Sequence, residues 1–253
     1  MDIFENERVD EVNERLRLIQ KTDGLTFGTD ALLLAAYVKK GYQNALELGS
    51  GTGIISMLLL ARDKVKKITA LEIQEEYARL TERNAELNGL TSRLTALEAD
   101  VRDFNGEGKF DLVFTNPPYM KSDAGKNNDK MKKSVARHEI CGNIYDFTAA
   151  ARRALKFGGD FYAVYRAERI SDLFCAMREN KIEPKLLTPV IANQKSEPSM
   201  SLVRGTLGAA AGLKFTRPFI IYKDENNKEY SEDMELVLQN GIFADSFTTK
   251  NVR

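Results

Sequence analysis

Four consecutive residues, Asn116-Pro117-Pro118-Tyr119, carry the groups needed to hold a planar amino group. An amine conjugated to a ring or a carbonyl is a poor nucleophile, because its lone pair is delocalised. Two acceptors aimed at its hydrogens, the Asn116 side-chain oxygen and the Pro117 carbonyl, would let the nitrogen pyramidalise toward an electrophile. The prolines fix φ and add no competing N–H, and Tyr119 offers a flat face for stacking. We call residues 116–119 the amine clamp; the alternative interpretation is an Asn-Pro turn that ends a strand.

A glycine-rich segment upstream of the amine clamp is suited to close contact with a ligand. Residues 47–53 read Glu-Leu-Gly-Ser-Gly-Thr-Gly and join an apolar run at 45–48 to a predicted helix at 54–61. Glycines let the backbone approach a ligand, and the following helix N-terminus offers N–H groups. Glu72 ends the next apolar run, where an acid can accept hydrogen bonds from both hydroxyls of a ribose. This pattern predicts a nucleoside site and fits NAD as well as S-adenosylmethionine (SAM).

Polar residues follow several predicted strands at the point where each strand ends. Asp100 comes after the strand predicted at 94–98, and the amine clamp comes after the strand predicted at 110–114. Open α/β sheets bind ligands at the carboxyl ends of their strands. We therefore expect the glycine-rich segment, Glu72, Asp100 and the clamp to border one crevice, with Asp100 accepting a hydrogen bond from an adenine amino group.

A polar and basic segment, residues 120–138, follows the clamp and contains six Lys or Arg residues against two Asp residues. One interpretation is a solvated, mobile loop. The other is a substrate loop that holds a polynucleotide backbone beside the pocket. The chain's single histidine, His138, lies at the end of this segment and is a candidate substrate contact. The candidate substrate-binding residues are Pro118, Tyr119, Lys130, Lys132, Lys133, Arg137 and His138.

The composition is that of an ordinary globular protein, 43% hydrophobic and 29% charged, with a formal net charge of zero. Zero net charge argues against a protein coated with positive charge, so attraction to RNA would depend on local patches. No apolar run is long enough for a membrane span, and the N-terminus lacks a secretory pattern. Two cysteines, Cys141 and Cys175, and one histidine argue against a disulfide framework or a metal site. We expect a cytoplasmic protein without a metal.

The elements that position these residues alternate between strands and helices, which is typical of an α/β fold with a parallel sheet. We predict one domain over residues 1–253, with a Rossmann-like, mostly parallel seven-stranded sheet and helices on both faces. Its last two strands should form an antiparallel hairpin. Strands are predicted at 45–48, 68–71, 94–98, 110–114, 161–165, 185–190 and 201–207, with a further β segment at 215–222. Helices are predicted at 31–38, 54–61, 74–88, 145–155 and 169–180.

The two ends of the chain carry weaker patterns. Residues 2–20 show a weak helical spacing, so residues 1–40 are predicted to be a helical extension. Thr29 or Asp30 is the expected N-cap of its last helix. The pair Gly158-Gly159 is expected to end the helix predicted at 145–155. Residues 223–253 are predicted to be a partly ordered tail that packs on the domain.

In combination, the glycine-rich segment, Glu72, Asp100 and the amine clamp resemble the motifs of Rossmann-like SAM-dependent methyltransferases. The Asn-Pro-Pro-Tyr form belongs to the branch that methylates amino groups. More narrowly, the chain resembles the tRNA1(Val) (adenine-N6)-methyltransferase family. This resemblance rests on residues 27–34, Phe-Gly-Thr-Asp-Ala-Leu-Leu-Leu, and on residues 137–139, Arg-His-Glu.

The resemblance implies N6-methylation of a tRNA adenine, the one 3′ of the anticodon, with S-adenosylhomocysteine as the second product. It implies no metal and no obligate protein partner, and we expect a monomer or weak dimer. Asn116, Pro117 and Tyr119 would act on the flipped adenine as the catalytic residues. The implied cofactor-binding residues are Phe27, Gly28, Thr29, Asp30, Glu47, Gly49, Gly51, Gly53, Glu72, Asp100 and Asn116.

Other functions share parts of this pattern. A glutamine-N5 methyltransferase of peptide release factors would use the same amine clamp, since a carboxamide and an adenine amine have similar NH2 geometry. A ribosomal RNA guanine-N2 methyltransferase has the same chemistry. A non-catalytic SAM- or RNA-binding module would have no need of an amine clamp. A nucleotide-binding oxidoreductase explains the glycines and Glu72 but leaves the clamp unexplained.

Overall fold

The computed structural model describes residues 3–24, 27–117 and 142–247. A nine-stranded sheet forms the centre of this described part. Its strand order is β10-β8-β9-β7-β6-β3-β4-β5, and β11 also pairs with β8. The strands are β3 (Tyr42–Leu48), β4 (Val65–Glu72), β5 (Leu94–Glu98), β6 (Phe110–Thr115), β7 (Leu155–Arg166), β8 (Ile182–Ile191), β9 (Met200–Leu207), β10 (Lys214–Phe215) and β11 (Phe219–Ile220).

The pairing confirms the predicted α/β architecture. Strands β5, β4, β3, β6 and β7 run parallel to one another, and β9 runs antiparallel between β7 and β8. All seven predicted strands are present, and β8 and β9 form the predicted antiparallel hairpin. The further β segment predicted at 215–222 corresponds to β10 and β11, two-residue strands that both pair with β8.

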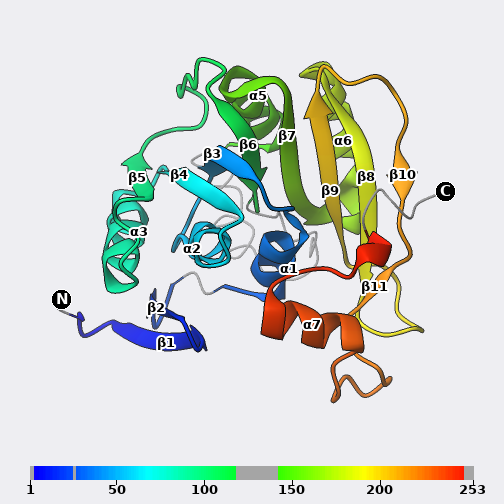
Figure 1. The fold of residues 1–253 in the computed structure, drawn as a ribbon, viewed down its shortest axis with the longest axis horizontal. Helices are drawn as coiled ribbons and strands as arrows, with labels where there is room; N and C mark the ends of the chain where they lie inside the picture. The colour runs from blue at the N-terminus through cyan, green and yellow to red at the C-terminus, as the bar shows by residue number, and fades with distance from the viewer. Residues whose placement is uncertain (1–2, 25–26, 118–141, 248–253) are drawn as a thin grey trace, which may run out of the picture.

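Helices cover both faces of the sheet because successive strand residues point in opposite directions. In β6, Leu112 and Phe114 belong to one core cluster, whereas Val113 belongs to the other. Helices α1 (Thr29–Tyr37), α2 (Ile54–Ala61) and α7 (Glu232–Asn240) contribute to the first cluster, and α5 (Ile144–Ala154) and α6 (Ile170–Glu179) to the second. Figure 1 shows these helices, together with α3 (Glu75–Leu87) beside β5. Two short 3-10 turns, η1 (Ala167–Arg169) and η2 (Asp245–Phe247), complete the described elements.

The N-terminal segment forms a β-hairpin, so the helix predicted over residues 2–20 is wrong. Strand β1 (Glu7–Asn13) pairs antiparallel with β2 (Leu16–Lys21) and forms a separate two-stranded sheet below α3 in Figure 1. Leu16 and Leu18 of β2 are buried on either side of the exposed Arg17, and the rest of the strand, from Ile19 to Lys21, is buried at every position. Of the predicted helical extension, residues 1–40, only α1 is helical among the described residues.

Asn84 of α3 and Asn88, the C-cap residue of α3, hydrogen-bond to the outer edge of this hairpin. Asn84 accepts a hydrogen bond from the Ile19 N–H at 2.7 Å and donates to the Ile19 carbonyl at 3.1 Å. One helical turn later, Asn88 bonds the N–H and carbonyl of Arg17 at 3.0 and 2.7 Å. Residues i and i+4 of a helix therefore satisfy alternate backbone positions of β2, as a neighbouring strand would. Asn84 also donates to the Thr52 carbonyl at 3.1 Å, which links the hairpin to the glycine-rich segment.

Helix α1 is present as predicted, but its cap differs. The N-cap is Gly28, with no side-chain capping bond, rather than Thr29 or Asp30. At the other end, the buried Lys64 ammonium donates to the carbonyls of Ala35, Ala36 and Val38 at 2.7–2.8 Å. A cation at a helix C-terminus satisfies carbonyls that lack a partner within the helix. Burial lowers the pKa of Lys64 to about 7.

Two further predictions concern the end of α5 and the C-terminal segment. Helix α5 ends at Ala154 and β7 begins at once, so Gly158 and Gly159 lie inside a strand instead of ending a helix. The β6–β7 pairing shifts register beside them, and Gly158 has a φ of 78° that accommodates the irregularity. In the predicted tail, α7 buries Met234 and Val237 in the main core cluster.

Candidate active site

The candidate site lies where three neighbouring strands end in register. Leu48 of β3 is paired with Leu71 of β4 on one side and with Thr115 of β6 on the other. The next residues along the chain are therefore neighbours at the carboxyl edge: Gly49, Glu72 and Asn116. The buried Thr115 hydroxyl donates to the Leu48 carbonyl at 2.8 Å and fixes the two strand ends to each other.

The glycine-rich segment turns sharply from β3 into α2. Gly49, Gly51 and Gly53 have φ values of 71°, 54° and 77°, a region that favours glycine. Gly53 is the N-cap of α2, and a Cβ at this position would lie 2.7 Å from a methyl carbon of Thr81. The conformation and the close contact with α3 both require glycine there.

Glu72 holds the glycine-rich segment from the end of the adjacent strand. Its Oε2 accepts a hydrogen bond from the Gly51 N–H at 2.9 Å, and its Oε1 accepts one from the Gln74 N–H at 3.1 Å. A carboxylate has about four lone-pair positions, so these two bonds leave acceptor capacity for a ligand. Both the predicted glycine segment and the predicted acid are thus brought to the same place.

Glu47 lies at the base of the site with almost no solvent exposure, and Ser56 of α2 donates a hydrogen bond to its Oε2. Burial raises the pKa of Glu47 to about 8, and the negative charge of Glu72 adds to this effect. The site therefore has two acidic side chains with different environments. Glu47 holds its proton near neutral pH, which limits the negative charge under the glycine-rich segment.

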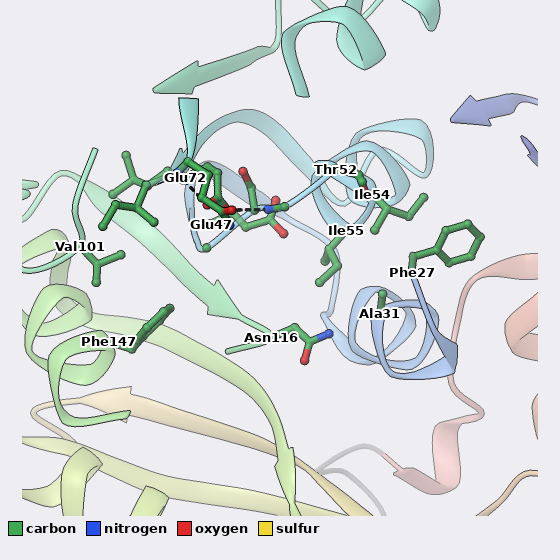
Figure 2. Close-up of a pocket in the computed structure, with 16 residues that line it drawn as sticks. Phe27, Ala31, Glu47, Thr52, Ile54, Ile55, Glu72, Val101, Asn116 and Phe147 are labelled. Carbon is green, nitrogen blue, oxygen red and sulfur yellow. Dashed lines mark hydrogen bonds between the residues drawn. The ribbon is translucent and has the colours of Figure 1, made fainter. Parts of the chain in front are cut away.

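A cavity opens between these strand ends and the helices around them. Figure 2 shows Val101 and Phe147 on one side, Phe27 and Ala31 on the other, and Asn116 between them. Its lining combines the glycine-rich backbone with apolar side chains, which suits a ligand with a flat apolar ring and polar edges. The lining residues are Phe27, Ala31, Glu47, Gly49, Ser50, Gly51, Thr52, Ile54, Ile55, Leu71, Glu72, Ile73, Gln74, Val101, Asn116 and Phe147.

Asn116, the first residue of the amine clamp, stands at the edge of this cavity. Its Nδ2 donates a hydrogen bond to Asp30 Oδ2 of α1 at 2.9 Å. The next clamp residue, Pro117, is buried. The clamp begins next to the cavity, as the sequence predicted from its position after β6.

The remaining predicted site residues fall into two groups. Among the described residues, Gly28, Thr29, Asp30, Gly53, Asp100 and Pro117 are near the site in sequence but are not part of the cavity lining. The others, Pro118, Tyr119, Lys130, Lys132, Lys133, Arg137 and His138, lie outside the described residues.

Asp100 is engaged with a neighbour on its own loop. Its carboxylate accepts hydrogen bonds from the Arg102 backbone N–H at 2.8 Å and from Arg102 Nε at 2.9 Å. The side-chain bond from Arg102 lowers the pKa of Asp100. Val101, between them, lines the cavity instead. The role of Asp100 toward an adenine amino group stays a prediction.

Sequence reasoning missed several lining residues. Ser50 and Thr52 lie inside the glycine-rich segment, so their positions were available from the motif. Ser50 Oγ is buried and has no hydrogen-bond partner among the described residues. Phe147 follows the basic segment in the chain, and only its helical spacing marks it as buried; a Cβ on Gly49 would lie 3.3 Å from its ring.

The described ranges lack two features that would point to other functions. None of the helices in them has both the length and the apolar composition to cross a bilayer. In the same ranges, no group of three or more His, Cys, Asp or Glu residues is arranged to hold a metal ion.

Comparisons with solved structures agree on the fold. A crystal structure described as a predicted O-methyltransferase from Agrobacterium tumefaciens matches with a TM-score of 0.69 and 22% identity, over 85% of this chain and 98% of the other. The structure of M. jannaschii TYW2 in complex with AdoMet matches with a TM-score of 0.56 and 13% identity, over 81% and 87% of the two chains.

Comparisons of sequence are more specific. A relative from Shewanella sediminis, named tRNA1(Val) (adenine(37)-N6)-methyltransferase, is 24% identical over 85% of this chain and 91% of its own length. A relative of the same name from Aeromonas hydrophila is 27% identical over 70% and 75% of the two chains. The family model described as methyltransferase small domain matches residues 21–174, which include the glycine-rich segment, Glu72 and the amine clamp. The chain therefore belongs to the methyltransferase small domain family.

Proposed function

We propose that this protein transfers the methyl group of SAM to N6 of an adenine in tRNA, at the anticodon-loop position 3′ of the anticodon. The observation that carries the proposal is the placement of Asn116 beside a cavity lined by the glycine-rich segment and Glu72. The substrate is supported by the relatives named tRNA1(Val) (adenine(37)-N6)-methyltransferase, which match this chain over most of its length.

The residues around the cavity fit SAM. The buried Ser50 Oγ lines the cavity and has no partner among the described side chains and backbone, so it is available to a polar ligand. Apolar residues such as Ile73, Val101 and Phe147 offer surfaces for an adenine ring, and Glu72 offers acceptors for ribose hydroxyls. We therefore assign the cavity to SAM, with Phe27, Glu47, Gly49, Gly51 and Glu72 among the contacts.

When bound, SAM supplies an electrophilic methyl group on a positively charged sulfur. The protein's part is to hold the target nitrogen in line with that methyl and to improve it as a nucleophile. The Asn116 side-chain oxygen and the Pro117 carbonyl are proposed to accept hydrogen bonds from the two N–H groups of the target amine. These acceptors stabilise the positive charge that develops on the nitrogen as its bond to the methyl forms and the methyl–sulfur bond breaks, and the methylated amine then releases one proton to water. Positioning supplies most of the rate.

An anticodon-loop adenine is a suitable target for such a clamp. The base must leave its stack to enter the pocket, at a cost of a few kcal/mol that is smallest for an unpaired base. We propose that Tyr119 stacks on the flipped base and that residues 120–138 contact the RNA backbone. In the same scheme, the protein acts as a monomer or weak dimer without an obligate protein partner.

The decisive experiment offers SAM with a labelled methyl group to unmodified tRNA and to a purified release factor in parallel. Label recovered as N6-methyladenosine after digestion of the tRNA would support the proposal. Label in the release factor would identify a glutamine methyltransferase instead. Label in neither would contradict both and direct the search to ribosomal RNA.

The same assay tests the clamp. Asn116→Ala is expected to abolish transfer while SAM affinity, measured by titration calorimetry, stays within a few-fold of wild type. The reason is that Asn116 acts on the amine, whereas most cofactor contacts come from other residues. Turnover at the wild-type rate in this variant would show that Asn116 has no role in the clamp.

The proposed substrate loop has its own test. Replacing Lys130, Lys132 and Lys133 with Gln is expected to weaken tRNA binding and to reduce its log–log salt slope by about 2, since each phosphate contact contributes about 0.7–0.9. Filter binding at several salt concentrations measures both quantities. An unchanged affinity and slope would leave residues 120–138 without a part in RNA binding.

A further inference from the structure

Asn116, the first residue of the amine clamp, is hydrogen-bonded to a residue of α1, which lies in the N-terminal part of the chain. Asn116 Nδ2 donates to Asp30 Oδ2 at 2.9 Å, across 86 positions of sequence. The other oxygen, Asp30 Oδ1, accepts the N–H of Ala31 in the first turn of α1 at 2.9 Å. One carboxylate therefore bonds both its own helix and the clamp.

This bond determines which end of the Asn116 amide faces Asp30. An asparagine amide has a donor end and an acceptor end of nearly the same shape, and a half-turn exchanges them. A clamp that presented its NH2 group to a target amine would oppose donor with donor. Because an ionised carboxylate only accepts hydrogen bonds, Asp30 pairs with the Nδ2 end and turns the Oδ1 end away from itself. In Figure 2 the Asn116 nitrogen lies on the side of α1.

The bond also affects the strength of the amide oxygen as an acceptor. Hydrogen bonds to an ionised group are about twice as strong as neutral ones. Donation from Nδ2 to a carboxylate polarises the amide and increases the negative charge on Oδ1. A more negative oxygen better stabilises the positive charge that forms on an amine as it is methylated.

The neighbouring glycine leaves room for this arrangement. Gly28 has a φ of −116°, which any residue can adopt. A Cβ at Gly28, however, would lie 2.7 Å from Asp30 Oδ1. The carboxylate is the flexible partner in this contact, so a larger residue at position 28 would displace Asp30 rather than the backbone.

We propose that Asp30 is a positioning residue that orients and polarises the Asn116 amide toward the target amine. This inference rests on the proposed function, because it assigns Asn116 to the clamp. It replaces the cofactor-binding role that the resemblance implied for Asp30, since Asp30 is not part of the cavity lining whereas Asn116 is.

Kinetics of methyl transfer separate the two roles. Asp30→Ala is expected to lower kcat by about 10- to 100-fold, the effect of losing one hydrogen bond to a charged group, and to leave the Kd and KM for SAM within about twofold. Gly28→Ala is expected to lower kcat in the same way, although it removes no functional group. The control is Asp23→Ala, which removes an exposed carboxylate seven residues before Asp30 and should leave kcat and the Kd and KM for SAM unchanged. A wild-type kcat in Asp30→Ala, or a SAM Kd that rises as kcat falls, would overturn the proposal.

The bond itself can be tested without turnover. Nuclear magnetic resonance of the 15N-labelled protein shows side-chain NH2 groups, and the Asn116 pair is identified by its loss in Asn116→Ala. We expect one Asn116 amide proton downfield in wild type and in Asp23→Ala, and shifted upfield in Asp30→Ala. Unchanged Asn116 resonances in Asp30→Ala would refute the inference. This result does not depend on the substrate, so it decides the role of Asp30 even if neither tRNA nor release factor is methylated.

Discussion

Replacing Glu47 with Gln should change how the stability of the ligand-free protein depends on pH. Glu47 is 1% exposed, and its Oε2 accepts a hydrogen bond from Ser56. Burial, with a smaller effect from the negative charge of Glu72, raises the pKa of Glu47 from 4.5 to about 8. Gln has the same shape and cannot ionise, so Glu47→Gln isolates the contribution of this one proton.

The sign follows from the protons bound in each state. Below about pH 4.5 the Glu47 carboxyl is protonated in the folded and the unfolded chain, and its contribution to stability is complete. Between pH 4.5 and about 8 the unfolded chain releases a proton that the folded protein keeps. The free energy of unfolding then falls by at most ~1.4 kcal/mol for each pH unit. Over the whole interval the loss has an upper limit of about 5 kcal/mol.

Urea denaturation followed by far-ultraviolet circular dichroism at pH 5.5 and pH 7.5 measures this effect. Relative to Glu47→Gln, wild type should lose about 2–3 kcal/mol between the two conditions. Comparing the two proteins cancels the other titrating groups that they share. The control is Glu98→Gln, at an exposed acid that ends β5, which should follow the wild-type pH dependence. If the difference between wild type and Glu47→Gln is the same at both pH values, Glu47 ionises normally and the reasoning is wrong.

Two other changes test contacts around the site. Glu72→Ala should weaken SAM binding about 30- to 150-fold, because the lost ribose hydrogen bonds are worth about 2–3 kcal/mol; titration calorimetry measures it, and a change below threefold would contradict a ribose contact. Asn84→Ala should lower the free energy of unfolding by about 2–4 kcal/mol, since the buried N–H and carbonyl of Ile19 lose their partner. Urea denaturation checks this against Asn88→Ala, whose bonds to Arg17 are exposed and should contribute about 1 kcal/mol.

The central sheet was predictable because its signals are local. Each of the seven predicted strands is a short apolar run followed by a turn or a helix, and the parallel arrangement follows from their alternation with helices. The placement of Glu72 and Asn116 at one edge follows from the same rule, since carboxyl ends of parallel strands meet there. The position of a motif that directly follows a buried strand can therefore be predicted from the sequence alone.

The N-terminal hairpin was not predictable from local pattern. Val9, Val12, Leu16 and Ile19 are spaced three or four residues apart, as in a helix. The contacts that hold the hairpin are distant in sequence: Asn84 of α3 and its C-cap residue Asn88 hydrogen-bond to the edge of β2, from 65 and 71 positions away. An asparagine on a polar helix gives no sign in the sequence that it will pair with a strand.

The hydrogen bond between Asp30 and Asn116 was likewise not predictable from local sequence pattern. Both residues were predicted to belong to the site, each from its own motif. Their contact arises because α1 packs against the sheet beside the end of β6, and no periodicity in either segment encodes that. The need for a small residue at position 28 comes from the side-chain conformation of Asp30, whose Oδ1 a Cβ there would approach, since the φ of Gly28 does not require glycine.

The position of β3 explains why these separate motifs can act together. Strand β3 lies between β4 and β6, and Leu48 is in register with the last core residues of both. The glycine-rich segment and the amine clamp therefore leave adjacent strands about 4.8 Å apart, and the hydrogen bond from the Thr115 hydroxyl to the Leu48 carbonyl holds the two strand ends together. Moving the clamp relative to the glycine-rich segment would require breaking a buried parallel ladder. Under the proposed function, substitutions that separate the ends of β3 and β6 should therefore lower kcat, whereas substitutions in residues 120–138 should lower the affinity for RNA.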